Sequence, residues 1–258
     1  MSSRHLLWVG TSWKMNKTLA EARAFIDEVA AEPVPAGIQP FVLPAHTSLA
    51  AVRDRLPPST PILLGAQNAH WGPEGAGTGE ISMRMAKDAG AQLIEMGHSE
   101  RRESFGETDA SVAAKAAAAL THLLIPLICV GEPWAVRQAG GAPAFIAAQV
   151  RSALSQLASK QIPQVVIAYE PIWAIGIGGQ PAAPEQIAPM MATIAATVAE
   201  RGTAISARAV LYGGGVNQQN AASILQDPHT DGLFVGRAGW LAKDFLEMLQ
   251  LSAPYARG

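Results

Sequence analysis

The sequence is poor in cysteine and in charge. Cys129 is the single cysteine among 258 residues, and Lys, Arg, Asp and Glu together make up 16% of them. One thiol excludes an intramolecular disulfide framework and fits a reducing compartment. The formal net charge is −2 and no basic run exceeds a pair. The sequence thus lacks the electrostatic footprint of a nucleic-acid-binding protein, and we expect no such partner.

Long hydrophobic runs are absent as well. The longest apolar stretches are about the length of a strand, far short of the ~20 residues that a membrane-spanning helix needs. Met1-Ser-Ser-Arg-His5 precedes only a short apolar stretch, which is too brief and too polar-flanked for a secretory signal. We therefore expect a cytoplasmic protein with no membrane partner.

The hydrophobic fraction, by contrast, is high at 49%. A chain of this length buries roughly three-quarters of its unfolded surface, so a core can form without disulfides or structural metals. The length suits one large α/β domain or two small ones. Because no Gly/Ser-rich or Pro-rich linker divides the chain, we predict a single domain over residues 1–258.

Short apolar runs alternate with longer helical patterns along the whole chain. The predicted strands are Leu6–Trp13, Gln39–Leu43, Ile62–Gln67, Ala91–Met96, Ile125–Val130, Gln164–Tyr169, Ala207–Tyr212 and Gly232–Val235. The predicted helices include Thr18–Ala31, Asp109–His122, Ala144–Ser159 and Pro184–Arg201. Strands without strict alternation are typical of a parallel sheet buried on both faces. Eight such units favour a closed (β/α)8 barrel, a TIM barrel, with an open doubly wound sheet as the alternative.

Polar and glycine-rich segments stand where predicted strands end. Lys14 follows the first strand, His98 follows the fourth and Glu170 closes the sixth. Glycine-rich segments, Tyr212–Val216 and Val235–Gly239, follow the seventh and eighth strands. In a barrel these positions share one face, the face on which (β/α)8 enzymes carry their active sites.

This combination suits proton transfer on a phosphorylated substrate. Backbone N–H groups in the two glycine-rich segments can cradle a phosphate, and Glu170 can take a proton from a carbon beside a carbonyl. Lys14 and His98 can stabilise the charge of an enediolate. Each residue alone has an ordinary structural explanation, but the joint placement favours a site. The six histidines show no metal-ligand spacing, so we predict neither a metal nor an organic cofactor.

Several motifs resemble the triosephosphate isomerase family, in the same order along the whole chain. They are Trp13–Asn16, Gly97–Arg102, Ile128–Glu132, Tyr169–Gly176, Tyr212–Gly214 and Asp231–Gly236. A glutamate base with a neutral histidine electrophile is the family's known mechanism, carried over by resemblance rather than inferred from spacing. It implies Glu170 as the base, His98 as the group that moves protons between the two oxygens, Lys14 as the positive charge and Glu100 as the residue that orients Lys14.

The resemblance also implies a lid and a phosphate site. The lid would comprise Pro171, Ile172, Trp173, Ala174, Ile175, Gly176, Ile177, Gly178 and Gly179, hinged at Pro171 and latched with help from Tyr212. Its closure would exclude water and protect the enediol phosphate from losing phosphate. Phosphate would be held by Gly176, Gly214, Gly215 and Gly236. By the same resemblance, Cys129 is a buried packing residue near the site and not a nucleophile.

An unusually long loop suggests a homodimer. Asn68–Glu80 contains Trp71 and several glycines and exceeds the usual length of a strand-to-helix connection. It resembles the family's third loop, which implies that Thr78 reaches the active site of a partner subunit. A flexible surface loop is the alternative.

Four substitutions near the expected substrate depart from the family pattern. Ser12 stands where Asn is usual, Gly179 where Lys is usual, and Gly215 where Ser is usual. Arg237 replaces a glycine that should face the phosphate. Arg237 could obstruct the phosphate, supply a charged bidentate contact, or point away. We include Ser12 and Arg237 among the substrate-binding residues.

These departures resemble a side branch of the family. The segments Gly10–Thr18 and Gln67–Trp71 share this resemblance. It implies that the protein interconverts L-erythrulose 1-phosphate and D-erythrulose 4-phosphate. This reaction belongs to carbohydrate metabolism, in the catabolism of erythritol. The smaller Ser12 would help house the extra carbon. The alternatives are the three-carbon reaction, dihydroxyacetone phosphate to D-glyceraldehyde 3-phosphate, and an inactive phosphate-binding barrel.

Overall fold

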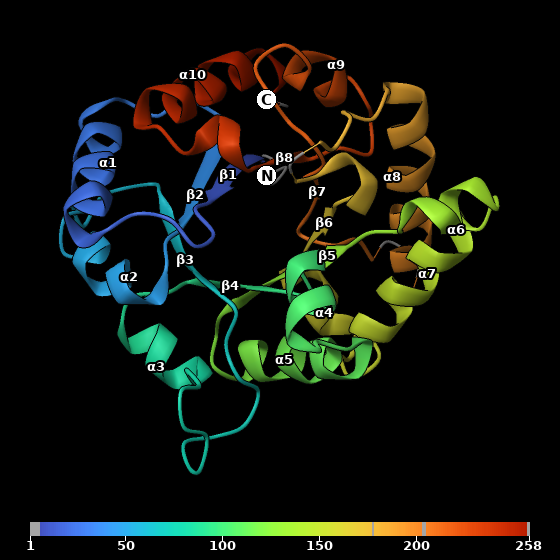
Figure 1. The fold of residues 1–258 in the computed structure, drawn as a ribbon, viewed down its shortest axis with the longest axis horizontal. Helices are drawn as coiled ribbons and strands as arrows, with labels where there is room; N and C mark the ends of the chain where they lie inside the picture. The colour runs from blue at the N-terminus through green and yellow to red at the C-terminus, as the bar shows by residue number, and fades with distance from the viewer. Residues whose placement is uncertain (1–5, 177, 203–204, 257–258) are drawn as a thin grey trace.

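The strands form a closed parallel barrel in sequence order, which confirms the predicted (β/α)8 fold (Figure 1). The structure is a computed structural model, and it describes residues 6–176, 178–202 and 205–256. The strands are β1 (Leu7–Ser12), β2 (Ile38–Leu43), β3 (Leu63–Gln67), β4 (Leu93–Met96), β5 (Ile125–Val130), β6 (Val166–Tyr169), β7 (Ala209–Tyr212) and β8 (Gly232–Val235). β4 begins later than predicted because the Ala91 N–H donates to Ala86 at the end of the preceding helix.

Helices surround the barrel on its outside (Figure 1). They are α1 (Leu19–Ala31), α2 (His46–Arg53), α3 (Met83–Asp88), α4 (Ser99–Phe105), α5 (Asp109–Thr121), α6 (Trp134–Gln138), α7 (Ala142–Ala153), α8 (Pro184–Ala199), α9 (Ala221–Leu225) and α10 (Ala242–Ser252). Short 3-10 turns cover Ser159–Gln164, Ile172–Ala174, Arg237–Gly239 and Ala253–Tyr255. Thr18 caps α1 through a capping box with Glu21, and Pro184 opens α8 as predicted.

The predicted end of α7 was wrong. The sequence pattern extended the helix to Ser159, whereas α7 ends at Ala153. Leu154 and Leu157 are buried in the turn that follows. Their spacing matches the apolar pattern of the helix, although the helix ends before them.

Side chains alternate between the inside of the barrel and the layer beneath the helices. The inside is filled by a small apolar cluster that includes Trp8, Phe41, Leu93, Cys129, Ala168 and Phe234. Residues two apart on a strand share a face. Ser12, Glu95 and Glu170 therefore continue the inward rows at the carboxyl ends of β1, β4 and β6. The apolar filling thus gives way to polar groups at this end of the barrel.

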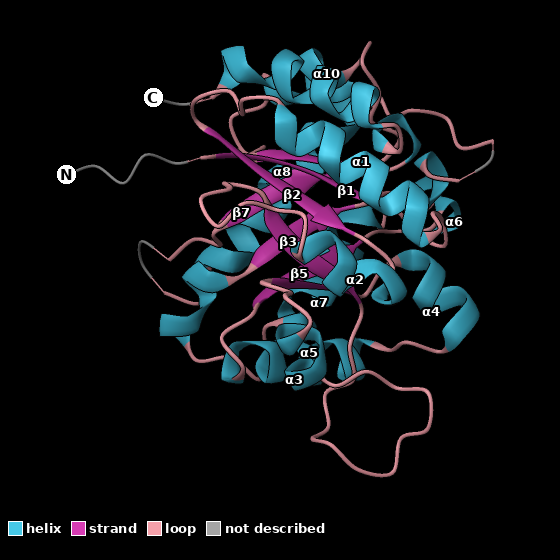
Figure 2. Ribbon diagram, turned by 90° about the vertical axis from the view of Figure 1, so that its left-hand side faces the viewer, coloured by secondary structure: helices cyan, strands magenta, loops and turns pink. Residues whose placement is uncertain are grey.

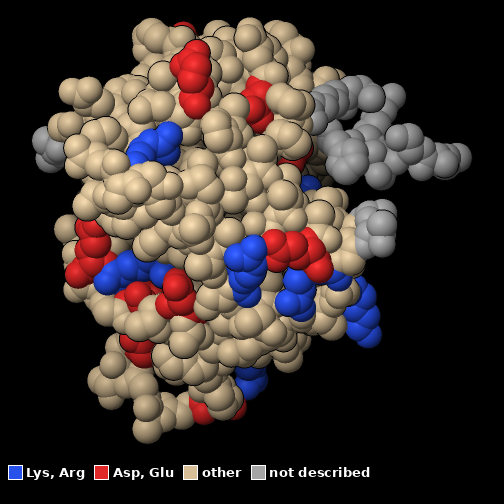
Figure 3. Space-filling view, turned by 90° about the vertical axis from the view of Figure 1, so that its right-hand side faces the viewer, with Lys and Arg blue, Asp and Glu red and all other residues tan. Residues whose placement is uncertain are grey.

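Two features of the surface bear on partners. The loop between β3 and α3 projects from the body of the molecule (Figures 1 and 2). The face in Figure 3 carries basic and acidic side chains interspersed among uncharged ones, so no field of a single sign covers it. Within the described ranges, no helix combines the length and apolar character that crossing a membrane requires.

Candidate active site

A pocket of about 500 Å³ opens at the carboxyl ends of the strands. It brings together most of the residues predicted from the sequence. The lining includes Ser12, Lys14, His98, Glu100, Glu170, Ala174, Ile175, Gly176, Gly179, Gly215, Gly236 and Arg237. Among the described residues, no cluster of three or more His, Cys, Asp or Glu is arranged to hold a metal ion.

Lys14 is held in a strained backbone conformation directly after β1. Its φ is 54°, in the left-handed region that residues other than glycine seldom adopt. The Lys14 Nζ lies 2.6 Å from Oε1 of Glu100, the second residue of α4. Strain of this kind persists when surrounding contacts hold it and is common in functional sites. The lysine charge is thereby fixed at the pocket edge.

His98 enters the pocket as a neutral imidazole. It is buried at the N-cap of α4, and its Nδ1 accepts a hydrogen bond from the Glu100 N–H at 3.2 Å. Burial, reinforced by the Lys14 charge, lowers the His98 pKa to about 4. Because Nδ1 is an acceptor, the ring proton resides on Nε2. That N–H faces Glu170, with Nε2 3.6 Å from the carboxylate Oε2.

Glu170 is the buried carboxyl at the end of β6. Burial, and next the Glu95 carboxyl, raise its pKa to about 8. Its Oε2 accepts no hydrogen bond from the residues described, which leaves one oxygen available to a reacting C–H. Cys129 lies beside it on β5, and burial, together with the Glu170 charge, raises the thiol pKa well above its usual range. The thiol therefore stays protonated and unreactive.

The glycine-rich segments after β7 and β8 contribute backbone to the pocket. Gly213, Gly215 and Gly236 line the pocket, whereas Gly214 does not. A Cβ at Gly214 would lie 2.7 Å from the Tyr212 hydroxyl and from a ring carbon of Pro171. Gly214 is thus required for packing beneath the lid. A Cβ at Gly236 would meet no atom within 4 Å, so its backbone is open to a ligand.

The segment predicted to form a lid is anchored at its first turn by a buried carboxylate. Glu132 Oε1 accepts hydrogen bonds from Trp173 Nε1 at 2.9 Å, from the Tyr169 hydroxyl at 3.1 Å and from Arg137 Nη1 at 2.9 Å. Pro171, Ile172 and Trp173 do not line the pocket, while Ala174–Gly176 and Gly179 do. Gly178 has a positive φ of 87°, and the predicted lid residue Ile177 falls outside the described residues. The described part of the predicted lid segment therefore has a hydrogen-bonded first turn and glycines at its far end.

Arg237 contacts the lid tip. It begins the 3-10 turn after β8, and its Nη2 donates a hydrogen bond to the Gly176 carbonyl at 2.8 Å. The side chain lines the pocket, so it does not point away, which was one of the three orientations considered from the sequence. The guanidinium thus links the eighth strand's loop to the lid across the pocket.

Glu95 is the site residue that the sequence analysis missed. It lies in β4, and the Ser12 hydroxyl donates to its Oε2 at 3.0 Å. Burial raises its pKa to about 7. A second cavity of about 270 Å³ adjoins the first and is lined by Glu95 as well as by Lys14 and His98. An acidic residue inside an otherwise apolar strand, three residues before His98, was the available signal.

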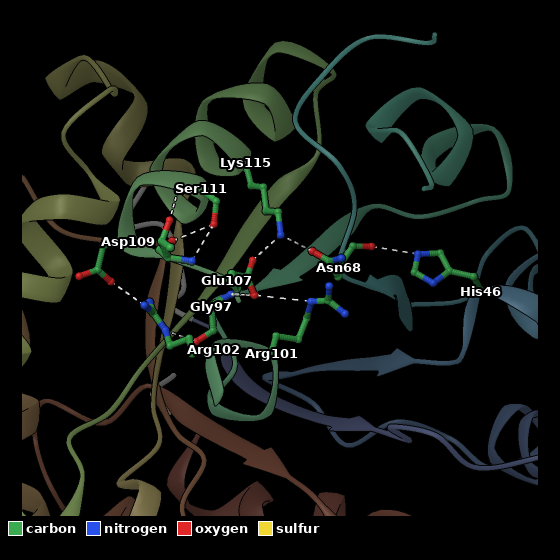
Figure 4. A network of polar contacts seen from close by, with 10 residues as sticks. His46, Asn68, Gly97, Arg101, Arg102, Glu107, Asp109, Ser111 and Lys115 are labelled. Atoms are coloured by element: carbon green, nitrogen blue, oxygen red, sulfur yellow. Dashed lines mark hydrogen bonds and ion pairs between the residues drawn. The ribbon is translucent and has the colours of Figure 1, made fainter. Parts of the chain in front are cut away.

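A buried ionic network fixes the base of the long loop (Figure 4). Lys115 of α5 donates to Glu107 and, at 2.7 Å, to the side-chain oxygen of Asn68. The other Glu107 oxygen accepts from the Gly97 N–H at 3.2 Å and lies 3.6 Å from Nε of Arg101. Since Gly97 immediately precedes His98, the same network steadies the histidine's loop.

Comparison with known proteins agrees with this geometry. Residues 7–252 match the profile of the family described as triosephosphate isomerase. The L-erythrulose-1-phosphate isomerase of Mycolicibacterium smegmatis is 48% identical over 255 residues, which cover 97% of this chain and 95% of that protein. Proteins of the same name from Rhizobium meliloti and Mesorhizobium japonicum are 48% and 49% identical, over 96% and 95% of this chain and 97% of each of theirs. The chain belongs to the triosephosphate isomerase family.

Proposed function

We propose that the protein is a cofactor-independent sugar-phosphate isomerase that converts L-erythrulose 1-phosphate to D-erythrulose 4-phosphate. The observation that carries the proposal is the proximity of a neutral His98 to a Glu170 oxygen that accepts no hydrogen bond from the described residues; the two atoms lie 3.6 Å apart. They lie beside Lys14 in a pocket that also contains exposed glycine backbone. A base, an N–H donor and a positive charge are the groups needed to move a proton between adjacent carbons.

In the proposed mechanism Glu170 removes the proton from C3, the carbon next to the C2 carbonyl. The Nε2–H of His98 donates to the carbonyl oxygen, and the Lys14 charge stabilises the developing enediolate. Glu170 then returns a proton to C2 while the C3 hydroxyl gives up its proton through His98. The carbonyl has moved from C2 to C3, and base and imidazole have regained their starting protonation. Closure of the lid keeps water from the enediol phosphate.

The four-carbon substrate is supported by two observations. The relatives named above carry the name L-erythrulose-1-phosphate isomerase. Glu95, which accepts a hydrogen bond from the Ser12 hydroxyl, lines the second cavity beside Lys14 and His98. The three-carbon reaction is the alternative, and an inactive phosphate-binding barrel is the more distant one.

The test is kcat/KM of the wild-type protein on L-erythrulose 1-phosphate and on dihydroxyacetone phosphate. We expect a preference for the four-carbon substrate of at least tenfold. A preference for the three-carbon substrate would support the alternative reaction. Tight phosphate-ester binding without exchange of solvent deuterium into either ketose would support the inactive barrel.

We further propose that the protein acts as a cytoplasmic homodimer through Asn68–Glu80, with Thr78 next to the partner's site. Met15 and Phe105 are 98% and 68% exposed and line the second cavity, and exposed apolar side chains beside a cavity are typical of an interface. Sedimentation analysis tests this proposal. Shortening the loop between Trp71 and Glu80 should convert a dimer into a monomer, and an unchanged mass would contradict the proposed interface.

A further inference from the structure

Glu95 is a buried acid that the proton-transfer mechanism does not use. On the inner face of the barrel its neighbours are Leu93 below it, Leu127 in register on β5 and Gln67 in register on β3. Among the described residues, its side chain receives a hydrogen bond from Ser12 and forms no salt bridge. Burying a carboxyl with so little compensation is unfavourable for folding, so this residue calls for an explanation beyond stability.

Glu95 lies where the end of a bound substrate opposite the phosphate would lie. The two cavities share Ser12, Lys14, His98 and Glu100. Gly215 and Gly236 line the first cavity and Glu95 lines the second. A ketose phosphate with its phosphate at the glycine-rich segments and its reacting carbons at His98 therefore extends its other end toward Glu95.

The chemistry of that end separates the two candidate substrates. A three-carbon ketose phosphate ends at the carbon from which the proton is removed, whereas a four-carbon one carries a further hydroxymethyl group there. A neutral carboxylic acid can both donate to and accept from a hydroxyl. The hydrogen bond from Ser12 to Oε2 fixes the carboxyl, and burial favours its neutral form.

We propose that Glu95, positioned by Ser12, binds the terminal hydroxymethyl group of the substrate and so selects a four-carbon ketose phosphate over a three-carbon one. This inference rests on the proposed function. Selection of this kind is effective because a buried polar group left without its partner disfavours the shorter substrate.

The experiment compares Glu95→Gln, Glu95→Leu and Ser12→Ala with the wild type on L-erythrulose 1-phosphate and dihydroxyacetone phosphate. The readout is a ratio, the kcat/KM value for L-erythrulose 1-phosphate divided by the kcat/KM value for dihydroxyacetone phosphate. That ratio does not respond to a change in the pKa of Glu170, because both substrates use the same base. We expect Glu95→Leu to lower the ratio roughly 10- to 100-fold, chiefly through the four-carbon substrate. Glu95→Gln, which keeps a donor and an acceptor, should stay within about tenfold of the wild type, and Ser12→Ala should fall between them.

Glu132→Gln is the matched control, because it alters another buried carboxylate that holds the lid rather than the substrate's end. It should change both kcat/KM values in parallel. A parallel loss on both substrates for Glu95→Gln and Glu95→Leu would overturn the inference and give Glu95 a structural role. The proposed function fails separately, if the wild type itself shows no preference for the four-carbon substrate.

Discussion

The Nε2 of His98 faces the Oε2 of Glu170 across 3.6 Å, although the two residues follow different strands of the barrel. The imidazole is neutral and the carboxyl is buried. An N–H donor on Nε2 and a carboxyl oxygen thus lie close together at the pocket. The predictions below follow from this pair and from the residues that hold it.

Replacing the base should abolish turnover and spare binding. Glu170→Ala is expected to lower kcat by about 10³-fold or more, because the Glu170 carboxylate is the one that lies against the His98 Nε2–H among the described residues. Binding of inorganic phosphate, measured by calorimetry, should change little. Glu185→Gln, an exposed carboxylate on α8, is the control. Near-normal turnover by folded Glu170→Ala would remove Glu170 from the mechanism.

The activity should depend on pH through Glu170. Burial raises its pKa to about 8, and only the ionised form accepts a proton. In the free enzyme kcat/KM should therefore rise with pH and level off above about 8. His98, with its pKa lowered to about 4, stays neutral across this range. If kcat/KM instead levelled off above about pH 6, where a phosphate ester loses its second proton, ionisation of the substrate would limit the rate.

The same pKa shift makes Glu170 unfavourable for stability at high pH. Its pKa is about 8 in the folded protein against an ordinary value of 4.5. The stability from the protonated group is fully present below about 4.5 and is lost as the pH rises through about 8. Glu170→Gln should therefore raise Tm at pH 9 and change it little at pH 4. Equal Tm values for the variant and the wild type at both pH values would contradict this shift.

Arg237 should affect substrate affinity. Its hydrogen bond to the Gly176 carbonyl joins the eighth strand's loop to the lid, and its charge lies at the pocket. We expect Arg237→Gly to raise KM about tenfold and Arg237→Lys to raise it less. A rise in the inhibition constant of inorganic phosphate would identify a phosphate contact, and an unchanged constant would identify a lid contact. Arg84→Gly is an exposed control, and unchanged kinetics in Arg237→Gly would exclude both roles.

The network at the base of the long loop should be important for stability. Glu107→Ala leaves Lys115 buried without its carboxylate, and such an unpaired charge typically destabilises a protein by about 3–5 kcal/mol. The double variant Glu107→Ala/Lys115→Met should regain much of that loss, because it removes the charge as well. Urea unfolding measures the free energy of unfolding of the single and the double variant. Equal losses in the single and double variants would show that the ion pair itself is not the reason for the instability.

Much of this architecture follows from the sequence alone. Eight buried apolar runs separated by helical patterns predicted the barrel, because strands covered on both faces need continuous apolar character. Lys14, His98 and Glu170 could be assigned to one face because each follows a predicted strand, and the carboxyl ends of parallel strands meet. The end of α7 could not be predicted, because buried turn residues such as Leu157 have the same spacing as helical ones.

Other properties were decided by the tertiary structure. Whether Glu95 faces the barrel interior depends on the register of β4 and on closure of the sheet, which no local pattern encodes. The direction of Arg237 depends on the position of Gly176, 61 residues away along the chain. The pKa values of His98 and Glu170 depend on burial and on neighbouring charges contributed by several strands. The sequence thus determines which groups are available, and the closed barrel determines which of them oppose each other and in which protonation state.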